Sequence, residues 1–250
     1  MPRIFAFTNQ KGGVGKTTSS AALGAAAAEL GKRVLLVDLD PQAGLTTSLG
    51  FDPATFETTV YEAFTDGVDL ASIIRDTKMP NVALVPANLD LAGAEAELIG
   101  EVAWERTLKE ALAPLADRYD LVMLDCPPSL GVLTTNALVA ADSAIVPMQC
   151  EYLALRALKQ LQTIISKVRR KANPRLRVRI LRTLYSGNTL HGREVFDEIA
   201  RVAPDEVLKT YIKRTVRFAD AAAAGETILS YAQSSDAAQA YRELAKELEI

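Results

Sequence analysis

The sequence is poor in the residues that build disulfide frameworks and zinc sites. Its 250 residues contain two cysteines, Cys126 and Cys150, and one histidine, and both cysteines stand in apolar surroundings. This set is too small for either kind of site, so we interpret the cysteines as buried thiols. Long hydrophobic runs are also missing, since runs such as residues 34–37 and 137–141 fall far below the roughly 18 residues that cross a bilayer. We therefore expect no membrane-spanning helix.

We also expect neither a targeting segment nor a bias toward disorder. The chain reaches a glycine-rich motif within about ten residues of its first methionine, so we expect it to stay in the cytoplasm. Hydrophobic residues make up 49% and charged residues 24% of the sequence, which excludes disordered and fibrous proteins. At this length we expect one domain over residues 1–250.

Short apolar runs alternate along the chain with helical patterns. The runs predict strands at residues 4–8, 33–38, 82–86, 121–125, 144–147 and 178–184. The patterns between them predict helices at residues 16–30, 104–115, 155–168 and 193–202. This alternation predicts an α/β fold, with a doubly wound, mostly parallel sheet, helices on both faces and ligands at the carboxyl ends of the strands. Residues 51–79 are irregular and polar, and we expect them to form a surface excursion.

A glycine-rich loop joins the first predicted strand to the first predicted helix. It reads Lys11-Gly12-Gly13-Val14-Gly15-Lys16-Thr17-Thr18. Glycines let backbone N–H groups turn toward phosphates, and the helix N-terminus adds partial positive charge. Lys16 can then reach the β- and γ-phosphates, and the Thr17 hydroxyl can ligate Mg²⁺. The loop therefore predicts a site for ATP and Mg²⁺, because the alternative, a turn with an incidental lysine, does not require the flanking strand and helix.

Carboxylates end two of the other predicted strands. Asp38 and Asp40 follow the second strand, where two carboxylates can orient a water and organise Mg²⁺ near the γ-phosphate. We assign the water to Asp40 and the metal surroundings to Asp38. Asp125 ends the apolar run 121–125 and is expected to reach Mg²⁺ through water; its alternative role is to cap the next helix.

One departure from the ordinary phosphate loop is informative. The usual pattern has glycine where this chain has Gln10, and a second lysine, Lys11, follows. This combination resembles the deviant Walker A ATPases of the ParA/MinD family, and residues 38–42 and 121–129 resemble the Walker A′ and Walker B elements of that family. The resemblance implies that Lys11 reaches across a homodimer to the partner's ATP; its alternative is a solvent-exposed loop lysine.

The C-terminal part resembles the chromosomal, Soj-like branch of that family at residues 151–155 and 212–217, so the likeness covers nearly the whole chain. The resemblance implies that Arg214 and Arg217, with Lys213 beside them, belong to a surface that binds DNA without sequence preference. It also implies an ATP-dependent homodimer, weak intrinsic ATP hydrolysis stimulated by DNA and a ParB-like partner, a role in chromosome or plasmid segregation or cargo positioning, and association with the nucleoid.

The distribution of charge agrees with a polyanionic partner. Residues 1–150 hold 10 Lys and Arg against 19 Asp and Glu, whereas residues 151–250 hold 18 against 12. A further basic group, which includes three candidate DNA-binding residues, Arg169, Arg170 and Lys171, fits phosphate contact because its thirteen residues contain no acid. The group consists of Lys167, Arg169, Arg170, Lys171, Arg175, Arg177 and Arg179. The alternative is a solvated basic face without a partner.

Some positions depart from the family pattern. The family usually has Pro and Asn where Lys213 and Thr215 stand, and an Asp-Ala-Arg triplet near residues 186–188, so the adenine contacts and one DNA-binding arginine stay unassigned. The single histidine, His191, is expected in a loop near the basic surface rather than as a catalytic base.

Two other classes of protein are alternatives. A MinD-like membrane-surface ATPase regulating cell-division placement ends in a basic amphipathic helix, whereas residues 241–250 are acidic at their tip, so we expect no membrane partner. A relative of the nitrogenase iron protein needs a cysteine pair for an iron–sulfur cluster, and that set is missing here.

Overall fold

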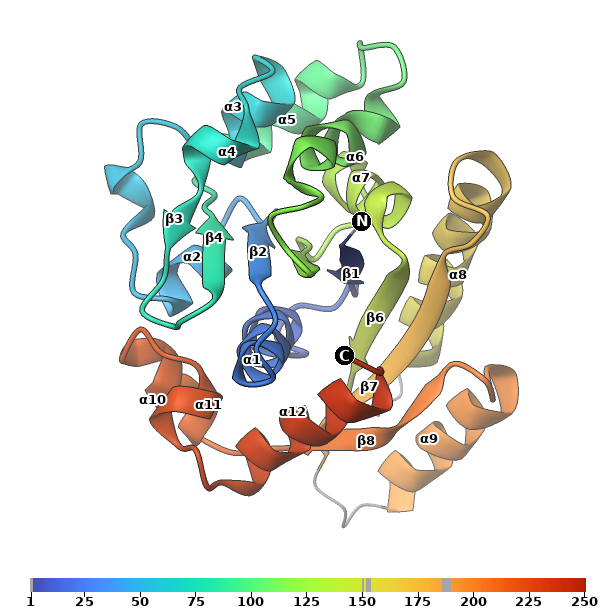
Figure 1. Ribbon diagram of the computed structural model, residues 1–250. Helices are drawn as coiled ribbons and strands as arrows, with labels where there is room; N and C mark the ends of the chain where they lie inside the picture. Colours follow the sequence, from blue (N-terminus) through green and yellow to red (C-terminus); the bar gives the residue numbers. More distant parts are fainter. Residues whose placement is uncertain (1, 150, 152–153, 186–189) are drawn as a thin grey trace.

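The computed structural model describes residues 2–149, 151, 154–185 and 190–250, and these form one central sheet with helices on both faces (Figure 1). The strand order is β3-β4-β2-β5-β1-β6-β7-β8, and every pair is parallel except β3 with β4. The doubly wound, mostly parallel sheet predicted from the sequence is confirmed. The strands are β1 (Arg3–Phe7), β2 (Val34–Asp38), β3 (Arg75–Asp76), β4 (Val82–Val85), β5 (Leu121–Asp125), β6 (Ser143–Met148), β7 (Arg177–Tyr185) and β8 (Val207–Lys213).

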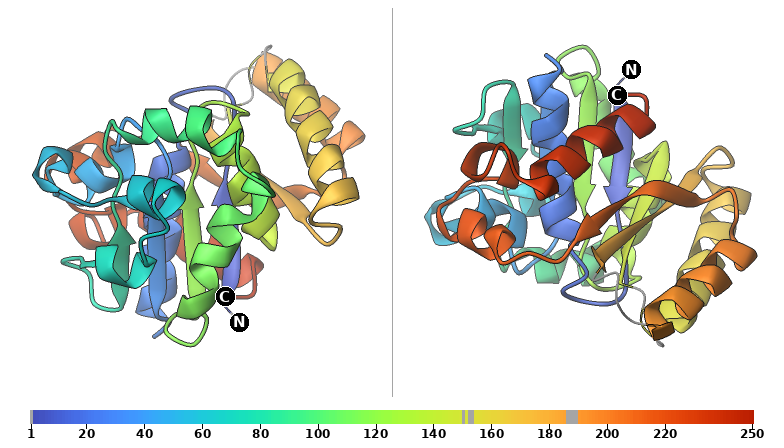
Figure 2. Two further views of the ribbon diagram at one scale, coloured as in Figure 1. Left: turned by 90° about the horizontal axis from the view of Figure 1, so that it is seen from above. Right: turned by 90° about the horizontal axis from the view of Figure 1, so that it is seen from below.

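Helices cover the two faces of this sheet unequally. Figure 2 shows α1 and α12 side by side on one face, with the segment from α3 to α7 on the other. The helices are α1 (Lys16–Glu29), α2 (Gly44–Ser48), α3 (Val60–Thr65), α4 (Leu70–Ile73), α5 (Leu91–Leu98), α6 (Thr107–Leu112), α7 (Val132–Ala140), α8 (Ala154–Lys171), α9 (Leu190–Val202), α10 (Arg217–Ala223), α11 (Ile228–Tyr231) and α12 (Asp236–Glu247). Short 3₁₀ turns lie at Pro53–Thr55, Trp104–Arg106 and Ala113–Leu115. No described helix is both long and apolar enough to cross a membrane.

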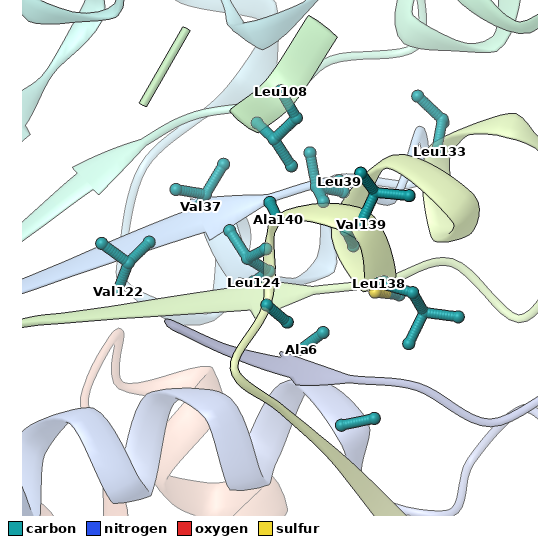
Figure 3. Close-up of a cluster of buried hydrophobic side chains, with 14 of the residues drawn as sticks. Ala6, Val37, Leu39, Leu108, Val122, Leu124, Leu133, Leu138, Val139 and Ala140 are labelled. Carbon is teal, nitrogen blue, oxygen red and sulfur yellow. The ribbon is translucent and has the colours of Figure 1, made fainter. Parts of the chain in front are cut away.

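The central strands are buried on both faces, which explains their continuous apolar sequence. Successive side chains of a strand point to opposite faces. Leu35 and Val37 of β2 therefore join the core beneath α6 and α7, part of which Figure 3 shows, while Val34 and Leu36 join the core beneath α1 and α12. All four side chains have 0% exposure. Two cores thus hold the sheet rigid from both sides, as expected for parallel strands.

Most predicted elements are present within one to three residues of their predicted ends, but two predictions need correction. The helix predicted at 104–115 is interrupted: α6 is flanked by 3₁₀ turns, and Pro114, which has no N–H to donate, lies in the second of them. The surface excursion predicted at 51–79 is wrong in part, because this segment contains α3, α4 and β3 and buries Val60, Leu70 and Ile73 completely.

Two smaller predictions concern single residues. Cys126 is a buried thiol, as predicted, and burial raises the pKa of its thiol. His191 belongs to the first turn of α9, so the prediction that it stands in a loop is wrong. Cys150 and residues 186–188 lie outside the described residues.

The fold brings the predicted motifs together at the carboxyl ends of neighbouring strands. The glycine-rich loop follows β1, and β2 and β5 end beside it with Asp38 and Asp125 in register. Phe7, the last residue of β1, is in register with Asp125 on the other side. The carboxyl ends of three neighbouring strands therefore converge on the start of α1.

Candidate nucleotide site

The glycine-rich loop has the backbone shape that a phosphate cradle needs. Gly13 and Gly15 have φ of +71° and +88°, a left-handed conformation that favours glycine. A Cβ added to Gly12 or Gly13 would meet nothing within 4 Å, so the space beside the loop is open. From β7, the Thr183 hydroxyl donates a 2.7 Å hydrogen bond to the Val14 carbonyl and ties the loop to the sheet. Nothing in the local sequence marks Thr183 as a site residue, since it is a threonine in the middle of a strand.

Lys16 lies at the bottom of this cradle. The residue is 7% exposed, and its ammonium donates a 3.5 Å hydrogen bond to the Lys11 carbonyl. Burial lowers the pKa of Lys16, while the nearby carboxylates Asp125 and Asp40 act in the opposite direction. A buried ammonium at a helix N-terminus is suited to an anionic ligand, because a phosphate would replace the hydration that burial removes.

Asp125 lies buried on the other side of Lys16. Both of its carboxylate oxygens are fully buried, and neither forms a hydrogen bond of ordinary distance and angle with a described residue, although the Thr17 hydroxyl lies nearby. Burial raises the pKa of Asp125 well above its usual range; neighbouring Asp38 adds to the rise, and the Thr17 hydroxyl and Lys16 oppose it. Buried polar groups in native proteins are nearly always partnered, so this carboxylate fits a cation that the bare chain does not supply.

Asp38, by contrast, already has partners. Its Oδ2 accepts hydrogen bonds from the backbone N–H and the hydroxyl of Thr46, both at 2.8 Å, and its Oδ1 accepts one from the Asp40 N–H at 3.1 Å. Burial raises the pKa of Asp38 to about 6, against these hydrogen bonds. Asp38 therefore shapes the loop after β2 and stands beside the cation position as a neighbour of Asp125. Within the described residues, no three His, Cys, Asp or Glu side chains form a metal cluster.

Asp40 and Lys11 lie at different sides of the loop. Asp40 lines the cleft together with the glycine-rich loop, and its Oδ1 accepts a 3.0 Å hydrogen bond from the Gln42 N–H. Lys11 turns away from its own cleft: its ammonium pairs with Glu151 at 2.5 Å and donates to Gln149 at 3.3 Å. The structure thus holds Lys11 within its own chain, on the side of the loop next to β6.

The cleft continues beyond the loop into an apolar wall that no sequence motif marks. Its volume is about 490 Å³. Apart from the loop, Asp40 and Pro128, its lining residues are Thr183, Leu184, Ile212, Thr215, Phe218, Ala219 and Tyr241. The Tyr241 hydroxyl forms a buried 2.9 Å hydrogen bond with Ser19 of α1, which joins this wall to the helix after the loop. A flat aromatic base could pack against such a wall, with its phosphates on the loop.

The six candidate DNA-binding residues do not form one surface. Arg214 and Arg217 are exposed and follow β8 at the edge of the cleft, and the Lys213 ammonium pairs with Asp236 at 3.3 Å. Arg169, Arg170 and Lys171 end α8 near the amino end of β7, whereas the cleft lies at the carboxyl ends of the strands. The nine residues of β7 separate these two ends by about 26 Å. In Figure 1 the loop from α8 to β7 lies at the upper right and the connection from β8 to α10 at the lower left.

Comparisons with known proteins agree with this geometry. A family model described as an AAA domain matches residues 2–178. The chain is 45% identical over 249 residues to the sporulation initiation inhibitor protein Soj of Bacillus subtilis, covering 99% of this chain and 98% of that protein. It is 40% identical over 249 residues to the chromosome-partitioning ATPase Soj of Treponema pallidum, covering 99% of this chain and 97% of that protein.

A solved structure extends the likeness to three dimensions. A Mycobacterium smegmatis protein described as cobyrinic acid a,c-diamide synthase, crystallised with ADP and magnesium, superposes with a TM-score of 0.88 at 45% identity, covering 100% of this chain and 94% of that one. The same protein has also been crystallised with an ATP analogue and magnesium. The matched fold therefore accommodates an adenine nucleotide with its metal in that relative.

Proposed function

Because this chain belongs to the family of Soj and ParA chromosome-partitioning ATPases, we propose that it is an ATP-dependent switch that dimerises, binds DNA without sequence preference and releases it after hydrolysis. The observation that carries the proposal is the unpartnered, buried Asp125 beside Lys16, beneath a loop whose glycines leave the space above them open. This arrangement leaves one carboxylate and one ammonium to be satisfied by a metal and a phosphate.

Different residues of the cleft would bind different parts of the nucleotide. The loop N–H groups and Lys16 would bind the phosphates, and the wall around Ile212 and Phe218 would hold the adenine. Asp125 and Thr17 would hold Mg²⁺, consistent with the magnesium in the M. smegmatis relative. When bound, Mg²⁺ neutralises charge that develops on the phosphates during transfer. Asp40, at the rim of the cleft, would orient the attacking water and accept its proton.

The switch would connect nucleotide to assembly through Lys11. The Lys11 side chain is 38% exposed, and its ammonium is held by contacts at the surface. It can therefore exchange Glu151 for the triphosphate of a facing subunit. Dimerisation would double the exposed cations around Arg214 and Arg217, and weak single-subunit contacts with DNA would then add. A ParB-like partner and DNA would stimulate a weak intrinsic hydrolysis, which returns the protein to the monomer and releases the DNA.

Sedimentation in the presence of Mg²⁺ with ADP, ATP or a slowly hydrolysed ATP analogue tests this function. We expect a monomer with ADP and a dimer with ATP or the analogue. Lys11→Ala should bind ATP with unchanged affinity but remain monomeric, because it loses the contact across the interface and none within its own cleft. Lys32→Ala is the matched control and should dimerise normally. A wild-type protein that stays monomeric at saturating ATP would overturn the proposal.

A MinD-like role at a membrane surface is the weaker alternative. That role needs a C-terminal helix whose apolar face is free to meet lipid. In α12 that face is part of the core, since Tyr241 and Leu244 are at most 1% exposed and pack over α1. Beyond the end of α12, the exposed residue Glu249 adds a negative charge. Flotation with anionic liposomes and ATP should therefore leave the protein at the bottom of the gradient.

The description of the M. smegmatis relative points to another ATP-dependent reaction, amide synthesis on a cobyrinic acid. A phosphate loop and a magnesium site would serve either reaction. The exposed Arg214 and Arg217 beside the cleft favour the switch, because two cations there can contact the phosphates of a duplex. ATP turnover that rises with duplex DNA and is unchanged by cobyrinic acid would separate the two activities.

A further inference from the structure

The end of β7 departs from a regular strand where it meets the nucleotide cleft. Leu184 has φ of +52°, a left-handed conformation that is uncommon for a residue other than glycine. Between Arg182 and Tyr185 the strand β7 advances three residues, while the facing strand β8 advances two. One extra residue with a register shift is a β-bulge, and we name residues 183–184 the β7 bulge.

The β7 bulge turns two successive residues toward the nucleotide cleft. In an unbroken strand, Thr183 and Leu184 would point to opposite faces of the sheet. Both residues instead line the cleft together with the glycine-rich loop. Thr183 is 3% exposed, and its hydroxyl donates the 2.7 Å hydrogen bond to the Val14 carbonyl. Its methyl group would lie 4.0 Å from a Cβ added to Gly15, so the whole side chain is packed against the loop.

Contacts on both sides hold the bulge in its strained conformation. Before the bulge, the Arg182 guanidinium donates a 2.9 Å hydrogen bond to the Lys209 carbonyl and lies 4.1 Å from the centre of the Phe196 ring. After the bulge, the Tyr185 carbonyl accepts a 3.3 Å hydrogen bond from the Arg214 N–H. Strained backbone persists where its surroundings fix it, and such strain is concentrated at functional sites. The bulge is therefore a candidate for a role in the cleft that it faces.

The hydrogen bond from Thr183 sets the orientation of one peptide unit of the glycine-rich loop. In a trans peptide, the C=O and N–H groups point in opposite directions. Because the Val14 carbonyl is directed at Thr183, the Gly15 N–H of the same peptide unit points away from Thr183. In the part of the chain that the structure describes, this N–H has no hydrogen-bond partner. A free N–H at the start of a helix is a donor suited to a phosphate.

We infer that Thr183 is a positioning residue for the phosphate loop. Its hydroxyl holds the Val14–Gly15 peptide so that the N–H is presented to a phosphate of the nucleotide, and the β7 bulge brings the hydroxyl to that place. Thr183 thus acts through Val14 rather than on the nucleotide itself. The inference rests on the proposed function, which supplies the identity of the ligand.

Thr183→Val tests this role, because it removes the hydroxyl and keeps the size and branching of the side chain. In ATP hydrolysis by the full-length protein with Mg²⁺, we expect KM to rise about tenfold with kcat unchanged, since a misdirected N–H weakens binding of substrate and transition state alike. Thr183→Ser keeps the hydroxyl and should restore KM. A purely structural hydrogen bond would instead lower the folded fraction, and so reduce kcat at constant KM; that result would overturn the inference.

Thr8→Val is the matched control. Thr8 follows β1 just before the glycine-rich loop and is fully buried, and its hydroxyl has no hydrogen-bond partner among the described residues. The same substitution there should leave KM unchanged. If the wild type hydrolyses ATP but Thr183→Val and Thr8→Val have equal KM, the inference fails and the proposed function stands. A wild type that neither binds nor hydrolyses ATP would overturn the proposed function and this inference with it.

A second pair of variants tests the bulge itself. Leu184→Asn keeps the left-handed conformation accessible, whereas Leu184→Val makes it costly, because β-branched residues are outliers there. If the bulge positions Thr183, Leu184→Val should raise KM several-fold more than Leu184→Asn, although valine is the better apolar lining for the cleft. The opposite order would show that Leu184 serves only as a wall of the cleft, and would overturn the role of the bulge.

Discussion

The ion pair between Lys11 and Glu151 decides where the second lysine of the loop points. Both side chains are partly exposed, 38% and 49%, and pairs of this kind are worth less than about 1 kcal/mol. The pair can therefore orient Lys11 in a single subunit and yet give way when a facing triphosphate offers more charge. In the proposed switch, Glu151 would thus restrain dimerisation, since the pair contributes little to the stability of the fold.

Glu151→Gln should weaken that restraint. We expect the variant to dimerise at an ATP concentration a few-fold lower than the wild type, with unchanged stability, because a surface pair costs little to remove. Analytical ultracentrifugation across an ATP series measures the shift. Glu110→Gln, an exposed glutamate on α6, is the control. An unchanged or higher ATP requirement for Glu151→Gln would show that Glu151 does not restrain Lys11.

Asp125 gives the nucleotide-free protein a specific pH dependence. Burial raises the pKa of Asp125 well above its usual range and the pKa of Asp38 to about 6. The folded protein therefore holds protons that the unfolded chain releases from about pH 4 upward, so this pair makes unfolding easier as the pH rises through 6. Asp125→Asn should remove the part of this loss of stability that Asp125 causes. Without nucleotide, the variant should therefore melt several degrees higher than the wild type at pH 7.

The same substitution should abolish the stabilisation that MgATP gives, because Asn supplies no charge for the metal. Thermal melts between pH 4 and 8, with and without MgATP, measure both effects. Asp76→Asn, an exposed aspartate on β3, is the control and should change neither. A nucleotide-free Asp125→Asn protein less stable than the wild type at pH 7 would contradict the assignment of an unpartnered buried carboxylate.

Single residues show what the sequence could and could not predict of the site. The loop from Lys11 to Thr18 was predictable because its contacts are local: glycines, a helix start and a lysine within eight residues. Thr46 and Thr183 were not, since their partners, Asp38 and Val14, are 8 and 169 residues away. The prediction of Asp38 as metal surroundings rested on its type and place, and only the fold reveals that Thr46 already occupies one of its oxygens.

At the scale of elements, the burial of a strand explains whether its sequence predicts it. β2 and β5 lie in the centre of the sheet, are buried throughout and were predicted to within one residue. β8 is an edge strand in which the buried Leu208 is followed by the exposed residues Lys209 and Tyr211, so no continuous apolar run marks it. No strand was predicted there. Residues 51–79 were read as irregular because each of their helices is six residues or shorter, too short for a helical period to be visible.

The edge strand β8 depends on α12 for its backbone hydrogen bonds. The Glu247 carboxylate accepts hydrogen bonds from the N–H groups of Lys209 at 2.6 Å and Thr210 at 2.9 Å. Glu247→Ala should lower the free energy of unfolding by about 1–3 kcal/mol, because two charge-assisted hydrogen bonds are lost. Urea unfolding measures the loss, and amide exchange at Lys209 and Thr210 should accelerate. Glu243→Ala on the same helix is the control, and equal losses for the two variants would exclude this role.

At the scale of the whole molecule, the phosphate loop and the basic C-terminal part are far apart in the sequence but lie close together in the structure. The first 150 residues carry the phosphate loop and an excess of acid, and the last hundred carry the excess of base. β8 brings Arg214 and Arg217 to the rim of the cleft that β1 and α1 build. In the proposed switch, nucleotide state would therefore act on these two arginines through assembly, without a long path through the core.

Arg214 and Arg217 give the last prediction, which concerns the assembled dimer. Two arginines from each of two subunits make four phosphate contacts, so the ATP-dependent part of DNA binding should have a slope of log K against log salt of about −3.6. The measurement is fluorescence anisotropy of a labelled duplex with the wild-type protein, with and without ATP. Adding Arg214→Ala and Arg217→Ala should abolish the gain from ATP while nucleotide binding and dimerisation persist, whereas adding Lys32→Ala and Lys109→Ala should leave the gain intact. An ATP-dependent gain that survives the loss of both arginines would place the DNA surface of the dimer elsewhere.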